Sequence, residues 1–152
     1  MQYKFKPFKE LSLIELYKIL QLRAEIFVVE QNCVYNDLDS NDEQAYHLMA
    51  FNNNDMVGYA RILPPGSRFK EASIGRLVVH KDFRFKGLAR QLMTTAADWV
   101  FEQWEVKCIQ ISAQKYLKAF YGSLGYQIIS DEYLEDGIPH LKMELQIDRA
   151  EQ

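Results

Sequence analysis

The sequence predicts an α/β fold, with a mixed central sheet and flanking helices, as a single domain over residues 1–152. Two observations carry this prediction: a pair of short strand-like runs precedes the midpoint, and strands alternate with helical patterns after it. A length of 152 residues, 48% of them apolar, is enough to build one sizeable core. The same composition excludes a disordered chain.

The first helix is expected to begin after Ser12, because Ser12 with Glu15 three residues later is a capping-box pattern. Apolar residues then recur at steps of three and four, which predicts one buried helix face. That face comprises Leu13, Leu16, Leu20, Ala24 and Phe27. Residues 32–42, which follow, are rich in Asp and Asn and indicate an acidic loop.

A hairpin is predicted next, from two apolar runs at residues 47–51 and 56–63. The four residues between them are Asn and Asp, which tolerate the positive φ of tight turns. Another strand is expected at residues 73–79. Its end, Leu77-Val78-Val79, is apolar without interruption and indicates burial on both faces.

The second half alternates between helix and strand. The apolar spacing predicts a long helix from Ala89 to about Trp104, a strand at 107–112 and a short helix at 115–124 that ends at Gly125. Two closing strands are expected at 126–130 and 140–145, on either side of a loop.

Charge and composition exclude several classes of protein. There are 18 basic and 21 acidic residues, and no extended basic run marks a nucleic-acid surface. No apolar stretch approaches the roughly 18 residues of a membrane span, and the first residues lack the apolar core of a secretory signal. With only Cys33 and Cys108, we expect a cytoplasmic protein with reduced thiols and no metal cofactor.

Residues 84–89 separate the strand ending at Val79 from the long helix, and they are a candidate anion site. The first N–H groups of a helix lack partners, and the helix dipole places positive charge there. Gly87 allows close approach of the backbone to a phosphate, and Arg84 and Lys86 add positive charge. A solvated surface turn is the alternative. The dinucleotide and P-loop fingerprints are both absent from the sequence.

The pattern Arg84-x-x-Gly87-x-Ala89 resembles the pyrophosphate loop of the GNAT family of N-acetyltransferases. A second block resembles that family's helix-to-strand segment, shortened before its Tyr. It reads Ala119-Phe120-Tyr121-Gly122-Ser123-Leu124-Gly125-Tyr126. Residues 22–33, 60–66, 74–79 and 135–140 resemble the ElaA-like branch of the family. The resemblance covers most of the chain and implies a single-domain acyl-CoA N-acyltransferase fold.

The resemblance also implies a reaction, in which acetyl-CoA is the donor and an amine attacks the thioester directly. The donor's pyrophosphate would lie on backbone N–H groups of the loop, that is, of Arg84, Phe85, Lys86, Gly87, Leu88 and Ala89. Its pantetheine would pair with the backbone of Leu77 and Val79, where two strands part. A backbone N–H near Val78 would stabilise the oxyanion, and Tyr121 would protonate the leaving thiolate.

Tyr121 has a plain alternative as a core residue, since Leu117, Phe120 and Leu124 share its helix face. The base that deprotonates the amine is open among Glu30, His47 and His140. Arg76 is expected to orient or pair with a carboxylate.

The acidic loop raises the hypothesis of a cationic acceptor, through Asp37, Asp39, Asp42 and Glu43. A solvated acidic loop is the alternative.

Two other functions compete with acetyl transfer. A thiol hydrolase would use Cys33 with His47 or His140, although the acidic neighbours of Cys33 disfavour a thiolate. A non-catalytic module would bind acyl-CoA without transferring the acyl group. A homodimer stays open, because no segment specifies a dimer surface.

Overall fold

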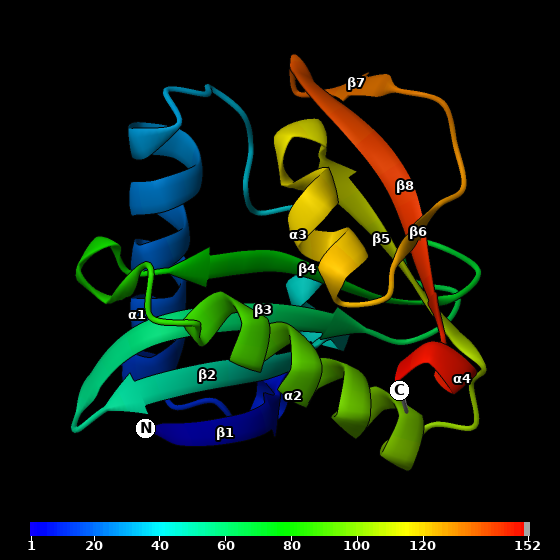
Figure 1. Cartoon of the computed structure of the whole chain (residues 1–152). Helices are drawn as coiled ribbons and strands as arrows, with labels where there is room; N and C mark the ends of the chain where they lie inside the picture. Colours follow the sequence, from blue (N-terminus) through cyan, green and yellow to red (C-terminus); the bar gives the residue numbers. More distant parts are fainter. Residues whose placement is uncertain (151–152) are drawn as a thin grey trace.

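The computed structural model describes residues 1–150, with side chains up to Asp148, and shows an eight-stranded mixed sheet flanked by helices (Figure 1). The strand order is β1-β2-β3-β4-β5-β8-β6, with β7 paired to β8. The strands are β1 (Gln2–Pro7), β2 (Tyr46–Asn52), β3 (Asp55–Leu63), β4 (Ala72–Val79), β5 (Cys108–Gln114), β6 (Gln127–Ile128), β7 (Tyr133–Glu135) and β8 (Ile138–Gln146). The helices are α1 (Leu13–Arg23), α2 (Leu88–Gln103), α3 (Lys118–Ser123) and α4 (Ile147–Ala150), and the π-helical segment η2 (Ala24–Glu30) continues α1. Short 3-10 turns cover Phe8–Glu10, Asp42–Gln44, Lys81–Phe83 and Lys115–Leu117. This is the fold class that the sequence predicts.

The two faces of the sheet carry different helices, because side chains alternate along each strand. Leu48 and Ala50 of β2 belong to the larger core, which lies under α2 and α3. Met49 and Phe51 belong to a smaller core on the other face, against α1. The predicted hairpin of β2 and β3 is confirmed, and its turn places Asn53 at a φ of 57°.

Helix α1 begins with the predicted capping box, in which Ser12 and Glu15 satisfy each other's backbone N–H groups. The predicted buried face of this helix is wrong. Leu13 is 87% exposed, whereas the buried residues are Glu15, Ile19, Leu22 and Arg23. The buried face carries two charged side chains whose partners are supplied by other segments, which a count of apolar residues does not register.

Strands β4 and β5 run parallel but pair at only two positions, Ala72 with Ile109 and Ser73 with Gln110. Beyond them β4 continues to Val79 beside β3, and β5 continues to Gln114 beside β8. The sheet therefore splits into two halves, as Figure 1 shows between β4 and β5. This split positions the site described below.

Several elements differ from the sequence-based expectation. Strand β1 was not expected, the segment 126–130 forms only a two-residue strand, and the expected loop around residues 135–139 is a β7–β8 hairpin with Asp136 and Gly137 at positive φ. Leu77 and Val79 are half-buried rather than buried on both sides. Within residues 1–150, no helix has the length and apolar character needed to span a membrane.

Candidate active site

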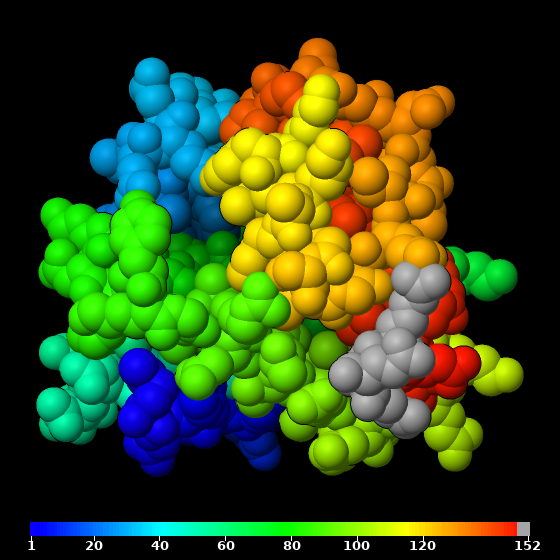
Figure 2. Space-filling model, viewed as in Figure 1, coloured from blue at the N-terminus to red at the C-terminus, as the bar shows by residue number. Residues whose placement is uncertain are grey.

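A cavity of about 480 Å³ fills the split between β4 and β5. Its walls come from α1–η2 and the loop after it, from β4 and the start of α2, from β5 and α3, and from the β7–β8 hairpin. In Figure 2 the blue, green and yellow segments meet around a hollow on this side of the molecule. The predicted site residues that line the cavity are Glu30, Leu77, Val78, Val79, Arg84, Phe85, Ala89, Tyr121 and His140.

A β-bulge shapes the β4 wall. Val78 pairs with Tyr59 and Gly75 pairs with Arg61, so three steps along β4 face two steps along β3. Arg76 lies at the bulge with a φ of 50°, a left-handed conformation that is uncommon for a residue with a side chain. Arg76 and Leu77 have no partner on β3 at this bulge, and both border the cavity.

The N-terminus of α2 lies at one end of the cavity, where Arg84, Phe85 and Ala89 form the lining. Gly87 is the N-cap residue, with a φ of 79°, and it has no side chain with which to cap the first N–H groups. These groups are therefore available to an anion. Lys86, Gly87 and Leu88 do not line the cavity; Lys86 lies over the Phe83 ring, and Leu88 is buried in the core.

Arg84 is bonded on two sides. Its Nη1 and Nη2 donate to the two carboxylate oxygens of Glu30, at 2.6 and 2.8 Å, and its Nε donates to the Val79 carbonyl at 3.4 Å. The hydrogen bonds from Arg84 hold the pKa of Glu30 below its usual range. Both Glu30 carboxylate oxygens are occupied in this arrangement.

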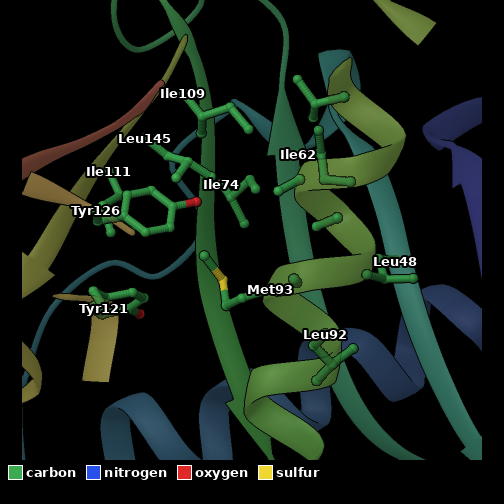
Figure 3. Packing of buried hydrophobic residues seen from close by; sticks show 14 of the residues in the cluster. Leu48, Ile62, Ile74, Leu92, Met93, Ile109, Ile111, Tyr121, Tyr126 and Leu145 are labelled. Atoms are coloured by element: carbon green, nitrogen blue, oxygen red, sulfur yellow. The ribbon is translucent and has the colours of Figure 1, made fainter. Parts of the chain in front are cut away.

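Tyr121, on α3, is 8% exposed and lines the cavity from the edge of the core (Figure 3). Its ring packs edge-on against Phe120 and Tyr126. The hydroxyl has no hydrogen-bond partner among the residues that the structure describes. Burial raises the pKa of Tyr121 to about 12, so the phenol is protonated throughout the neutral range.

The opposite end of the cavity holds polar side chains centred on Glu135. This carboxylate forms an ion pair with Arg68, accepts a 3.4 Å hydrogen bond from Ser112, and lies 3.3 Å from Nε2 of His140. Nδ1 of His140 lies 2.6 Å from the Ile138 carbonyl. Because a carbonyl only accepts, Nδ1 carries a hydrogen in this contact, and Nε2 is the ring nitrogen that faces the Glu135 carboxylate.

Sequence reasoning did not single out Glu135, Arg68 or Ser112. The polar residues of the 135–140 segment were a usable signal, but the hairpin that folds them toward β5 was expected as a loop.

Three of the four acids considered for a cationic acceptor pair with arginines of this chain, and the exposed Glu43 does not take part. Their largely buried network with three arginines is here called the arginine–aspartate cluster: Arg23, Arg61, Arg76, Asp37, Asp39 and Asp42. Asp37 alone accepts from Arg23 Nε, Arg76 Nε and the Tyr35 hydroxyl, at 2.8, 2.8 and 2.9 Å.

The cluster supplies the carboxylate that Arg76 was expected to pair with. Burial alone would raise the pKa values of Asp39 and Asp42, but hydrogen bonds and charge from the arginines outweigh burial and hold both below their usual range.

His47 and the cysteines do not form a second reactive centre. His47 is buried, bonded to the Tyr59 hydroxyl and the Asp42 carbonyl, and burial lowers its pKa. The Cys33 thiol donates to the Asp136 carbonyl at 3.4 Å rather than to a histidine. Cys108 is only partly buried at the start of β5, and no group of metal-ligating side chains occurs among the described residues.

Comparison with known proteins identifies the class of this fold and site. The family model described as an acetyltransferase (GNAT) domain matches residues 19–147, which is most of the chain. The chain therefore belongs to the GNAT family, whose members use acyl-CoA as co-substrate.

The ElaA-like character is also confirmed. The chain is 38% identical to Escherichia coli ElaA over 143 residues, covering 93% of this chain and 94% of ElaA. The crystal structure of E. coli ElaA superposes with a TM-score of 0.89 at 35% identity, covering 95% of this chain and 99% of that one. An acyl-CoA N-acyltransferase from Pseudomonas aeruginosa matches with the same TM-score at 38% identity and the same coverage. A UPF0039 protein of Schizosaccharomyces pombe is 40% identical over 97% of this chain and 98% of its own length.

Proposed function

We propose that the protein transfers an acetyl group from acetyl-CoA to a primary amine, of a small molecule or of a lysine or N-terminal residue. The observation that carries the proposal is the cavity in the β4–β5 split. It joins the uncapped N-terminus of α2 at one end to the Tyr121 hydroxyl and His140 farther in. The family model supports the acetyl donor, since it is described as an acetyltransferase domain.

Donor binding uses backbone groups. The N–H groups of residues 84–89 take the pyrophosphate at the positive end of α2. The parted edge of β4 offers the backbone of Leu77 and Val79 to pantetheine, in the manner of an added strand. The Val78 N–H, next to the bulge, donates to the oxygen that becomes negative when the amine attacks.

Tyr121 acts as the general acid. When the carbon–sulfur bond breaks, the electron pair goes to sulfur, and the phenol donates its proton to that atom. A group that remains protonated at neutral pH is suited to this role, and the absence of a hydrogen-bond partner among the described residues leaves its proton free to be donated to substrate.

His140 is the base we favour among the three candidates. Its Nδ1 donates to the Ile138 carbonyl, which leaves Nε2 to accept the amine proton, and Glu135 at 3.3 Å stabilises the imidazolium that then forms. Glu30 has both oxygens on Arg84, and His47 does not line the cavity.

The test is release of CoA thiol from acetyl-CoA in the presence of monoamines, polyamines, amino acids and lysine-containing peptides. We expect turnover with at least one amine class, and a loss of kcat in His140→Gln without a change in the Kd of CoA. Saturable CoA binding with no turnover across the panel would instead identify a non-catalytic acyl-CoA-binding module.

A further inference from the structure

Arg84 connects the end of β4 to the η2 wall of the cavity. Its Nε bonds the carbonyl of Val79 at the end of β4, and its two terminal nitrogens bond Glu30, the last residue of η2. Arg84 and Glu30 are 54 positions apart in the sequence, and both line the cavity. The pair therefore closes a bridge across the place where the donor enters.

All three guanidinium nitrogens donate in this bridge, through three of the five N–H groups. A carboxylate and a phosphate both bind a guanidinium through two parallel N–H···O bonds, and so they compete for the same donors. Glu30 therefore occupies Arg84 in the way that a phosphate of the donor would. The Val79 carbonyl, which Nε contacts, also belongs to the backbone that pantetheine requires.

We propose that Glu30 is a positioning residue for the donor site: it holds Arg84 across the cavity in the free protein, and the pyrophosphate of CoA displaces it. This inference rests on the proposed function, since it takes CoA as the donor. When CoA binds, its pyrophosphate replaces the Glu30 carboxylate on Arg84. The free-energy cost of this replacement is that of breaking the Glu30–Arg84 pair. Both side chains are partly exposed, at 43% and 32%, so this cost is modest.

The experiment is the Kd of CoA, measured by calorimetry for the wild type, Glu30→Gln, Arg84→Ala and the double variant. Removing the charge of Glu30 frees Arg84, so Glu30→Gln should bind CoA about two- to fivefold more tightly. In the Arg84→Ala background the same substitution should have no effect. The gain should shrink at 1 M salt, because exposed charges are screened.

Two controls separate this role from a structural one. Pantetheine lacks the pyrophosphate, so its Kd should be the same for the wild type and Glu30→Gln. Glu132 pairs with Lys115 at 2.8 Å and comparable exposure away from the cavity lining, so Glu132→Gln should leave the Kd of CoA unchanged.

The inference is overturned if Glu30→Gln binds CoA equally or more weakly, or if pantetheine gains affinity to the same extent. If the wild type binds CoA and Glu30→Gln does not bind it more tightly, only this inference fails. If neither protein binds CoA, the proposed function fails with it.

Discussion

Tyr121 and Tyr126 are buried tyrosines on the same helix-to-strand segment, in edge-on contact with each other. Tyr121 lines the cavity, whereas the Tyr126 hydroxyl is buried without a hydrogen-bond partner in the described part of the chain. The two residues have similar packing, but they differ in access to the cavity. Variants of the two residues therefore separate the proposed acid role of Tyr121 from the core role that the shared helix face also predicts.

Replacing Tyr121 by Phe should lower kcat by about 10²- to 10⁴-fold, because the leaving thiolate loses its proton donor. The Kd of CoA should not change, since the ring and its packing are kept. Tyr126→Phe is the matched control and should keep full turnover. Normal turnover of Tyr121→Phe, with the best amine of the panel, would remove the hydroxyl from the mechanism.

Local motifs indicated residues at the α2 and α3 sides of the cavity, but not those around Glu135. Short sequence patterns contain Arg84, Gly87 and Tyr121, and each pattern can be recognised from residues that are adjacent in the sequence. Glu135 and Arg68, in contrast, are 67 positions apart, and they meet only because the β7–β8 hairpin folds over the split. No pattern within either segment encodes that contact.

At the level of secondary-structure elements, the proposed anion site lies at the start of α2. Gly87 has a φ of 79°, and a Cβ built there meets no atom within 4 Å. The space in front of the helix is therefore open, and the conformation itself favours glycine.

Gly87→Val should abolish measurable CoA binding, because a branched side chain would stand where a phosphate approaches the helix N-terminus. Gly66 is the matched control: its φ is 85°, a Cβ there also meets nothing within 4 Å, and it lies in the β3–β4 loop rather than at the N-terminus of α2. Gly66→Val should incur a similar backbone strain and keep the Kd of CoA. Equal CoA affinity for Gly87→Val and the wild type would contradict the phosphate site.

Helix α1 shows why helical periodicity predicted the element and not its orientation. The capping box at Ser12 is local and was predicted correctly. The side that faces the sheet is set by Arg23, whose guanidinium is fully buried against Asp37 and Asp42. A charged residue in an apolar pattern, with acids some 15 residues later, is the signal that would have identified this face.

Across the whole molecule, the arginine–aspartate cluster connects α1, β3 and β4 to the 31–45 segment. Arg76 belongs to the bulge of β4, so the cluster also holds the strand that forms the donor wall. A buried charge whose partner is removed is costly, which makes the cluster a determinant of stability.

Asp42→Asn should lower the free energy of unfolding by about 3–5 kcal/mol at pH 7, because Arg23 and Arg61 lose a buried partner. The pKa of Asp42 is lowered in the folded state, so its contribution is present above its ordinary value of 3.8 and is lost as the pH falls below it. Denaturant unfolding should therefore show the difference from wild type shrinking from pH 5 to pH 3. Glu43→Gln, at an exposed neighbouring position, should have little effect on the free energy of unfolding at either pH. If the loss of stability in Asp42→Asn does not depend on pH, the link between the Asp42 charge and stability is contradicted.

The order of the main helices and strands was predicted from sequence, because apolar periodicity and turn residues are local properties. The partial pairing of β4 and β5 was implied only by the family resemblance, and the β7–β8 hairpin and strand β1 were not predicted, since each depends on which distant strand is adjacent. The cavity is a product of the first two of these features.

The most direct test of a CoA site in the β4–β5 split is thermal unfolding of the purified protein titrated with acetyl-CoA, CoA and ATP. A ligand at one hundred times its Kd adds about 2.7 kcal/mol of stability, which raises Tm by several degrees for a domain of this size. We predict a saturable rise with both CoA species and none with ATP. The absence of a shift with acetyl-CoA and CoA, or an equal shift with ATP, would contradict the account.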